Sequence, residues 1–174
     1  MRTEAHRSRG AGRTVLAALF LLALSAGAAG AAEAGEAAPK FANPDLKGNY
    51  VRYATVVGKK WIVIDFFATW CVPCKEELPS LEALQLEAGA DKLQILVFAT
   101  DKEKDKVREF FDQKPTNLTI LLDPYQVTYL RYNAAEDGLP TVFLINREGK
   151  IEMKQIGYSA EFIKQLRARI LETR

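Results

Sequence analysis

The sequence is poor in the residues from which metal centres and disulfide frameworks are built. Its 174 residues include two cysteines, two methionines and one histidine. Two cysteines cannot staple a small domain through several disulfides, and one histidine excludes any site that needs two. The formal net charge is only +2, so no strong field indicates a nucleic-acid partner, and we expect none. Eleven glycines and seven prolines are too few for a fibrous or wholly disordered chain.

What is present is typical of a single globular domain. Hydrophobic residues make up 48% of the chain and charged residues 26%. A chain of this length can bury a sizeable core without the help of disulfides.

The N-terminus has the three parts of a secretory signal peptide. Several arginines precede an apolar stretch from Val15 to Leu24, and small residues follow. The triplet Ala29-Gly30-Ala31 is an A-x-A cleavage site. We therefore predict a signal peptide over residues 1–31, or an uncleaved membrane anchor over residues 15–32. Either reading makes the protein periplasmic or otherwise exported.

Beyond this leader the chain predicts an α/β domain. Residues 32–40 are rich in Ala and Glu and are interpreted as a flexible lead-in to a domain over residues 41–174. Short apolar, β-branched runs then alternate with helical patterns, which predicts a central sheet with helices on both faces. The expected strands are Trp61–Phe67, Leu93–Thr100, Leu118–Leu122, Thr141–Ile145 and Lys150–Ile156.

Local signals set the expected turns and helix starts. Gly48-Asn49 predicts a hairpin ahead of the first long strand. Asp101, which opens a run of alternating charges, is expected to cap a helix, and Ser159 to cap the last one. Pro124 is expected in the first turn of a helix that runs through Tyr129.

The chemistry is concentrated in Trp70-Cys-Val-Pro-Cys-Lys75, which contains both cysteines of the chain, Cys71 and Cys74. Zinc needs four ligands, and the sequence has no second C-x-x-C and no histidine beyond His6 to complete the set. Two thiolates can hold Cu(I), so a Cu(I)-binding metallochaperone module is an alternative. A purely structural disulfide would close a loop too short to constrain the unfolded chain much.

The position of the pair favours redox chemistry. With Cys71 near the N-cap of a helix, unpaired N–H groups and the positive end of the helix dipole favour its thiolate. Cys71 can then attack a client disulfide, and Cys74 can attack the resulting mixed disulfide and release the reduced client. The redox-active disulfide Cys71–Cys74 is itself the working group, so we expect no cofactor and no bound metal.

The segment Asp65-Phe-Phe-Ala-Thr-Trp-Cys-Val-Pro-Cys-Lys75 resembles the active-site segment of the thioredoxin superfamily. With Glu76-Glu-Leu-Pro79, Gly138-Leu-Pro-Thr141 and Phe143-Leu-Ile-Asn-Arg-Glu-Gly149, the match is more specifically to exported TlpA/ResA-like thiol-disulfide oxidoreductases. The resemblance implies a thioredoxin-like fold, with a central mixed β-sheet flanked by helices and an N-terminal β-hairpin extension.

The resemblance also assigns roles to residues around the cysteines. Asp65 matches the buried acid of thioredoxin, and Glu77 matches an acidic position that TlpA/ResA-like proteins carry, so both join the cysteines as candidate catalytic residues. In an apolar run the carboxyl pKa of Asp65 should be raised by desolvation, which suits a proton acceptor. The strand Leu93–Thr100 lacks the lysine that partners this acid in thioredoxin.

The same resemblance places client binding on residues that flank the pair. Pro140 matches the cis-proline of the family, and Leu139 precedes it. Trp70, expected to cover Cys71, completes with Val72 and Pro73 the candidate substrate-binding set.

The direction of electron flow is inferred from the two residues between the cysteines. Val72-Pro73 lacks the histidine of DsbA-type oxidants, so we predict a reductase of protein disulfides, with a thiol oxidant or isomerase of the same fold as the alternative. Thr69 stands two positions before Cys71, so the Thr-x-x-Cys frame of thiol peroxidases is absent.

The resemblance also implies the partners. Protein disulfides and dithiols are the expected clients, in cytochrome c maturation or copper-site assembly, and a membrane electron donor of the CcdA/DsbD type is expected to re-reduce the pair. We expect the protein to be a monomer.

Overall fold

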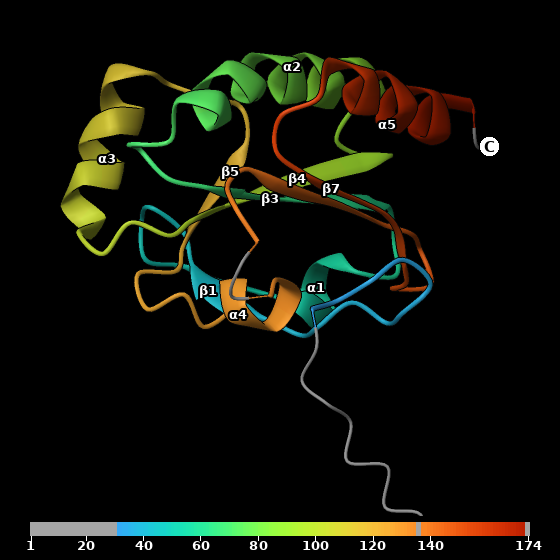
Figure 1. Cartoon of the computed structure of the whole chain (residues 1–174), viewed down its shortest axis with the longest axis horizontal. Coiled ribbons are helices and arrows are strands. Elements are labelled where there is room, and N and C mark those ends of the chain that lie inside the picture. The colour runs from blue at the N-terminus through green and yellow to red at the C-terminus, as the bar shows by residue number, and fades with distance from the viewer. Residues whose placement is uncertain (1–30, 135–136, 173–174) are drawn as a thin grey trace, which may run out of the picture.

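The computed structural model describes residues 31–134 and 137–172 (Figure 1). The predicted signal peptide (residues 1–31) or membrane anchor (residues 15–32) lies outside the described residues, except for residues 31 and 32. Among the described residues, no helix is long and apolar enough to cross a membrane.

A five-stranded mixed sheet forms the centre of the domain, in the order β5-β4-β3-β6-β7. Strands β3, β4 and β5 run parallel, while β6 is antiparallel to both β3 and β7. A separate two-stranded hairpin, β1-β2, precedes the sheet, as expected. The strands are β1 (Ala42–Pro44), β2 (Tyr50–Arg52), β3 (Trp61–Phe67), β4 (Leu93–Ala99), β5 (Thr119–Leu122), β6 (Thr141–Ile145) and β7 (Ile151–Ile156).

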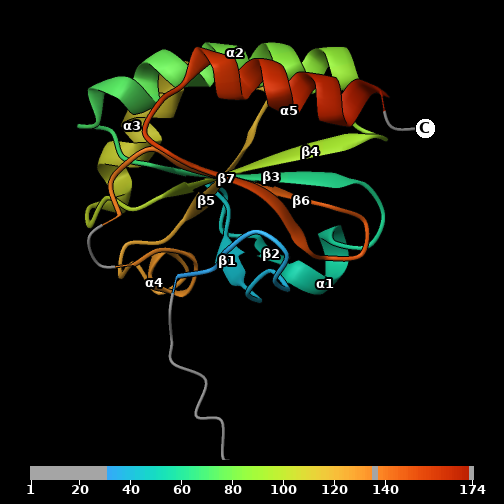
Figure 2. The ribbon, with the colours of Figure 1, turned by 45° about the vertical axis from the view of Figure 1, so that its right-hand side comes forward.

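Helices cover both faces of the sheet, which confirms the predicted α/β architecture. Figures 1 and 2 show α2 and α5 side by side over one face, and α1, α4 and the hairpin below the other. The helices are α1 (Tyr53–Val56), α2 (Val72–Ala88), α3 (Lys104–Gln113), α4 (Tyr129–Tyr132) and α5 (Ala160–Glu172).

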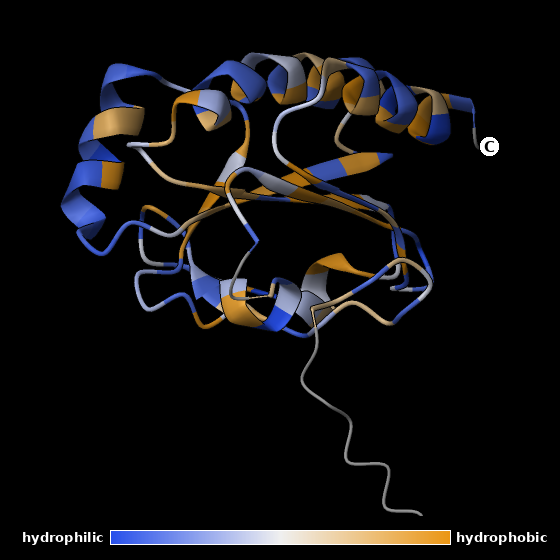
Figure 3. Ribbon diagram, viewed as in Figure 1, coloured by the Kyte–Doolittle hydropathy of each residue, from blue (hydrophilic) through white to orange (hydrophobic). Residues whose placement is uncertain are grey.

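Alternation along β3 divides the core into two layers. Trp61, Val63 and Phe67 face α2 and α5, whereas Ile62 and Phe66 face the α4 side. The central strands are accordingly almost wholly hydrophobic, while α3 presents mostly hydrophilic residues (Figure 3). By the same alternation Asp65 belongs to the α2 face, so a carboxylate enters the larger apolar layer.

The segment ahead of the hairpin packs against the domain, so the expectation of a flexible lead-in over residues 32–40 is wrong. The Ala32 backbone N–H donates to the Tyr132 carbonyl at 3.0 Å, and the Ala38 N–H donates to the Gly149 carbonyl at 2.9 Å. Ala32 and Ala38 are buried in the α4-side layer. Small side chains allow this backbone to lie close to the aromatic rings of that layer.

Two expected helix starts are also wrong. α3 begins at Lys104 with Glu103 as its N-cap, and Asp101 bonds elsewhere. Pro124 lies in a turn, and α4 begins only at Tyr129. The carboxylate of Asp123 accepts from the N–H groups of Thr128 and Tyr129, which supplies the first turn of α4 with its missing partner.

The last helix begins as predicted. The Ser159 hydroxyl accepts from the Phe162 N–H at 3.2 Å. Phe162, Leu166 and Ile170 then bury one face of α5 against the sheet.

Candidate active site

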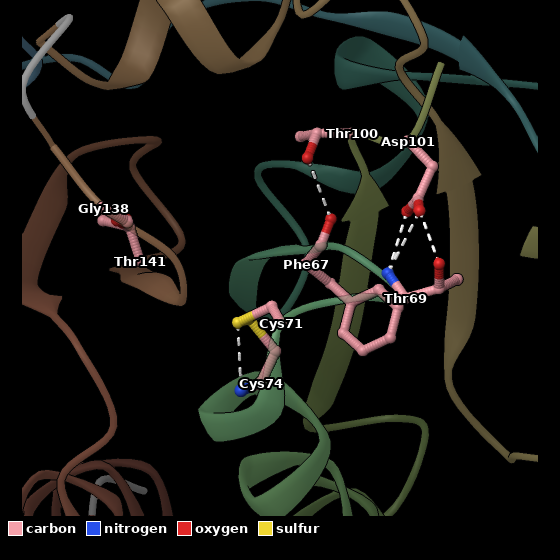
Figure 4. The surroundings of a disulfide bond; sticks show 8 residues. All are labelled: Phe67, Thr69, Cys71, Cys74, Thr100, Asp101, Gly138 and Thr141. Atoms are coloured by element: carbon pink, nitrogen blue, oxygen red, sulfur yellow. Dashed lines mark hydrogen bonds between the residues drawn. A yellow bond between two sulfur atoms is a disulfide. The ribbon is translucent and has the colours of Figure 1, made fainter. Parts of the chain in front are cut away.

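The two cysteines lie where β3 passes into α2. Cys71 is the N-cap residue of α2, with extended backbone angles, and Pro73 lies in the first turn. The Cys71 and Cys74 sulfurs form a disulfide of 2.02 Å, and the Cys74 N–H points at the Cys71 sulfur at 3.2 Å (Figure 4). Because the first N–H groups of a helix have no partner within it, the same contact would stabilise a thiolate on Cys71 after reduction.

A carboxylate on the neighbouring strand end fastens the loop ahead of Cys71. The Asp101 carboxylate accepts from the Thr69 N–H at 3.0 Å and from the Thr69 hydroxyl at 2.6 Å (Figure 4). The Thr100 N–H and hydroxyl both donate to the Phe67 carbonyl. The register of parallel strands β3 and β4 brings these residues together across the two strand ends. Thr69 and Asp101 were not identified as site residues, because Asp101 following a strand resembles a helix cap.

Asp65 lies on β3 with its carboxyl group fully buried. Among the described residues neither carboxyl oxygen has a hydrogen-bond partner. Burial, and secondarily the charge of Glu77, hold the pKa of Asp65 well above its usual range. The raised pKa expected from the sequence is therefore present.

Glu77 is buried on the inward face of α2, one turn after Cys74. Its carboxyl oxygens also lack a hydrogen-bond partner in the described part of the chain. Burial raises the pKa of Glu77 to about 7. Residues three apart share a helix face, so Glu77 shares the face of Cys74, and the coupling between the two acids places it near Asp65. Two buried carboxyl groups with raised pKa values therefore lie on the interior side of the cysteine pair.

The Leu139–Pro140 peptide bond is cis, as the resemblance predicted. Pro140 precedes β6, whose first residue, Thr141, pairs with Phe66 at the end of β3. This pairing brings the proline loop beside the loop that contains the cysteines, and Figure 4 shows Gly138 and Thr141 across from the disulfide. Leu139 is half-buried against both layers of the core.

The residues that flank the cysteines are exposed, whereas the cysteines are not. Cys71 is 3% exposed and Cys74 is fully buried. Trp70 is 70% exposed, Val72 is 59% exposed, and Pro73 is also at the surface. Most of the indole therefore lies in solvent, which leaves it available for contact with a partner.

No group of three or more His, Cys, Asp or Glu side chains that could hold a metal ion occurs within residues 31–134 and 137–172. The chemistry that the arrangement supports is thiol–disulfide exchange: a first sulfur at a helix N-terminus between exposed neighbouring residues, a fully buried second sulfur, and buried acids that can exchange protons with it.

Comparison with known proteins agrees with this geometry. Residues 34–154 match the model of the AhpC/TSA family. The chain is 32% identical over 123 residues to the thioredoxin-like protein YneN of Bacillus subtilis, covering 69% of each chain. It is 29% identical over 120 residues to the thiol-disulfide oxidoreductase ResA of Bacillus thuringiensis, covering 69% of this chain and 68% of the relative.

A solved structure shares the fold closely. A putative thiol:disulfide interchange protein DsbE from Chlorobium tepidum superposes with a TM-score of 0.74 at 30% identity, covering 82% of this chain and 98% of that one. The chain therefore belongs to the AhpC/TSA family of thioredoxin-like proteins, and it is a thiol-disulfide oxidoreductase of the ResA and DsbE type.

Proposed function

We propose that this protein works as an exported reductase of protein disulfides. The observation that carries the proposal is Cys71 at the N-cap of α2, flanked by the exposed Trp70 and Val72, together with the buried Cys74, Glu77 and Asp65. Export rests on the leader predicted from the sequence, whose basic, apolar and small-residue parts follow in the order of a signal peptide.

The proposed cycle begins with the reduced pair. The Cys71 thiolate attacks one sulfur of the client disulfide, which forms a mixed disulfide and releases the other client sulfur as a thiolate that takes up a proton. Cys74 then loses its proton and attacks the Cys71 sulfur. The Cys71–Cys74 disulfide forms, the second client sulfur leaves as a thiolate, and two electrons have passed to the client. A dithiol donor returns two electrons to the protein by the reverse exchange.

Asp65 and Glu77 are proposed as the groups that accept the proton of Cys74. The thiol is buried, so water reaches it poorly, and an ionised carboxyl nearby is the available base. A carboxyl pKa near 7, as at Glu77, lets the group accept and return a proton close to neutral pH.

The same two acids support the reductive direction. A protein is a strong oxidant when its reduced, thiolate form is stabilised. Buried carboxyl groups that become negative close to the pair destabilise that thiolate, and the intervening Val72-Pro73 supplies no positive charge to offset them. The dithiol therefore gives up its electrons more readily.

The proposed partners follow from the compartment. Protein disulfides on the pathways of cytochrome c maturation or copper-site assembly are the clients, and they contact Trp70, Val72 and Pro73 on one side and Leu139 and Pro140 on the other. A membrane electron donor of the CcdA/DsbD type supplies the electrons, because an exported disulfide has no cytosolic reductant.

The reduction potential of residues 32–174 tests the direction. The protein is equilibrated in dithiothreitol or glutathione buffers and the redox state is followed by tryptophan fluorescence. A potential near that of thioredoxin, about −270 mV, is expected for a reductase. A potential near that of DsbA, about −120 mV, would make the protein an oxidant and overturn the proposal.

A further inference from the structure

Lys154 on β7 has a charged group that is almost entirely buried. Its side chain is 11% exposed, and its ammonium lies over the ring of Phe143, its partner residue on β6, at 5.6 Å from the ring centroid. The ammonium contacts the carboxylates of Glu33 and Asp137 at 2.7 and 3.3 Å. Burial alone would lower the pKa of Lys154, but the bonds to Glu33 and Asp137 outweigh it and raise that pKa, so the side chain is charged at neutral pH.

Asp137 is the member of this cluster that belongs to the proline loop, residues 137–140. Its side chain is 10% exposed. Besides the Lys154 ammonium, its carboxylate contacts the Ala134 N–H, from which it accepts a hydrogen bond of 3.0 Å. The Asp137 carbonyl accepts from the Tyr129 hydroxyl. Both the side chain and the backbone of Asp137 are therefore held in place, and the ion pair with Lys154 supplies the only opposite charge within 4.0 Å of the carboxylate among the described residues.

The rest of the proline loop leaves one set of backbone groups open. The Gly138 carbonyl accepts from the Thr141 hydroxyl at 2.6 Å. The Pro140 carbonyl accepts from the Gly157 N–H at 2.8 Å. The N–H and carbonyl of Leu139, by contrast, form no hydrogen bond with any residue that the structure describes. Because Gly138 and Thr141 lie across from the disulfide (Figure 4), these open groups are close to the bond that a client exchanges.

The cluster has two carboxylates for one ammonium, and this ratio decides what each charge does. Without the ammonium, the nearly buried Asp137 carboxylate would have no counter-charge and would lie near a second carboxylate, that of Glu33. A buried charge that loses its partner is strongly destabilised, so Asp137 would move and the proline loop with it. Without the charge of Glu33, which is 59% exposed, Lys154 and Asp137 would remain a matched pair.

We infer that Lys154 is a positioning residue for the reduction of protein clients. It acts through Asp137: the ion pair fixes the proline loop, and the loop presents the Leu139 backbone and Pro140 to the client polypeptide beside the disulfide. The inference rests on the proposed reductase function, and it adds to the site a residue of β7 that lies outside the cysteine motif and the proline loop.

Two substrates distinguish positioning from a general loss of structure. One is a peptide with several residues on each side of an oxidised Cys-x-x-Cys, which can lie along the proline loop. The other is hydroxyethyl disulfide, which has no polypeptide backbone. Stopped-flow tryptophan fluorescence gives the second-order rate constant at which the reduced protein reduces each of them.

The variants are K154M, K154R, D137N, the double variant K154M/D137N, and E33Q. K150M is the matched control, at an exposed lysine directly before β7. D137N keeps the shape of its side chain and K154R keeps the charge, so the test remains decisive if K154M does not fold.

K154M should lower the peptide rate constant about tenfold, because the loop that orients the client is displaced. The rate constant for hydroxyethyl disulfide and the reduction potential of the pair should stay at their wild-type values. D137N should act like K154M, and the double variant should react no more slowly than K154M alone, because both changes remove the same ion pair. K154R should recover most of the peptide rate, and E33Q and K150M should keep it.

The outcomes separate the two proposals. If the wild-type protein does not reduce the peptide, the proposed reductase function fails. If it does, but K154M and D137N keep the wild-type ratio of the two rate constants, the reductase function stands and Lys154 does not position the client. The same conclusion follows if K154R lowers the ratio as far as K154M does.

Discussion

The Glu77 carboxyl group is buried, so its ionised form is unfavourable and its pKa is raised to about 7. Below that pH the carboxyl group is protonated and cannot accept the proton of Cys74. The proposed second step, in which Cys74 attacks the mixed disulfide, should therefore accelerate as the pH rises through about 7. Asp65, with its raised pKa, acts in the same direction.

Replacing Glu77 by Gln should remove this acceleration. General base catalysis contributes at least about a hundredfold in typical enzymes, and because Asp65 remains we expect about a tenfold loss at pH 8 and little change at pH 6. Single-turnover stopped-flow fluorescence across this pH range measures the rate. Glu76→Gln, at the exposed neighbouring position, is the control and should follow the wild-type profile. A Glu77→Gln profile that coincides with that of the wild type would remove Glu77 from the proton path.

Asp101 acts on the site through Thr69 and is best called a positioning residue. Asp101→Ala leaves the Thr69 N–H without its carboxylate and should lower the free energy of unfolding by about 2 kcal/mol, the usual effect of losing bonds to a charged group. Hydrogen exchange at the Thr69 amide should accelerate together with that loss. Asp105→Ala, which removes an exposed ion pair to Arg108 and the acidic charge in the first turn of α3, should change stability by less than about 1 kcal/mol. Equal urea midpoints for the two variants would contradict this assignment.

At the scale of the elements, the strands were predictable and several helix starts were not. The expected bounds Trp61–Phe67 and Thr141–Ile145 agree with β3 and β6. A buried strand can be recognised from its own sequence, because its residues form a continuous apolar run. Asp101, in contrast, bonds Thr69, thirty-two residues earlier in the chain. A sequence pattern over a few residues cannot show a partner so far away in the chain, so Asp101 was predicted to cap the helix that follows it.

The candidate site also has a part that was predictable from the sequence and a part that was not. The cysteine pair, the buried Asp65 and the cis bond before Pro140 could be predicted from a motif and a resemblance. The burial of Glu77 needed the structure, because Glu76 and Glu77 are adjacent and only their positions around the helix axis decide which of them faces the core. Residues 32–40 packed unexpectedly because their partner, the layer around Tyr132, is formed by chain about a hundred residues later.

The turn between β6 and β7 offers a test of packing between elements. Gly149 has a φ of 78°, and a Cβ there would lie 2.6 Å from the hydroxyl oxygen of Tyr53. Gly89 has nearly the same φ, 77°, with no heavy atom within 4 Å of such a Cβ. Gly89→Ala should thus lower stability by about 1 kcal/mol through backbone strain alone. Gly149→Ala should lower it by about 1–3 kcal/mol more, because the turn and α1 must separate.

Thermal or urea unfolding of the two alanine variants in parallel measures this difference. Equal losses would show that Tyr53 moves aside freely and that α1 does not brace the turn.

At the scale of the whole molecule, the buried acids make stability depend on pH. In the folded protein Glu77 keeps its proton up to about pH 7, whereas in the unfolded chain it loses it near 4.5. The folded state therefore binds more protons between these values, and its stability falls as the pH rises through that window. The full effect corresponds to about 3 kcal/mol, present below pH 4.5 and lost above pH 7.

Glu77→Gln keeps the shape of the protonated acid without its ionisation. It should match the wild type near pH 4 and be more stable by up to about 3 kcal/mol at pH 8, as measured by urea unfolding of the oxidised protein at several pH values. A stability difference that stays constant with pH would show that Glu77 does not change its ionisation on folding. The variant that slows the proposed chemistry is thus expected to be the more stable protein.

The segment that runs from Glu36 to Asp45 contacts both edges of the central sheet. Ala37 forms a bridge with Lys150 at the start of β7, and the Ile151 N–H donates to the Glu36 carbonyl. Asp45 forms a bridge with Leu121 on β5, at the opposite margin. The unpaired N–H and C=O groups of an edge strand can form hydrogen bonds with a strand of another chain, and this pairing is a route to aggregation. One short stretch thus pairs with both edge strands, at one bridge each, so a protein shortened to begin after it would lose this cover at both edges of the sheet and should aggregate edge to edge more readily.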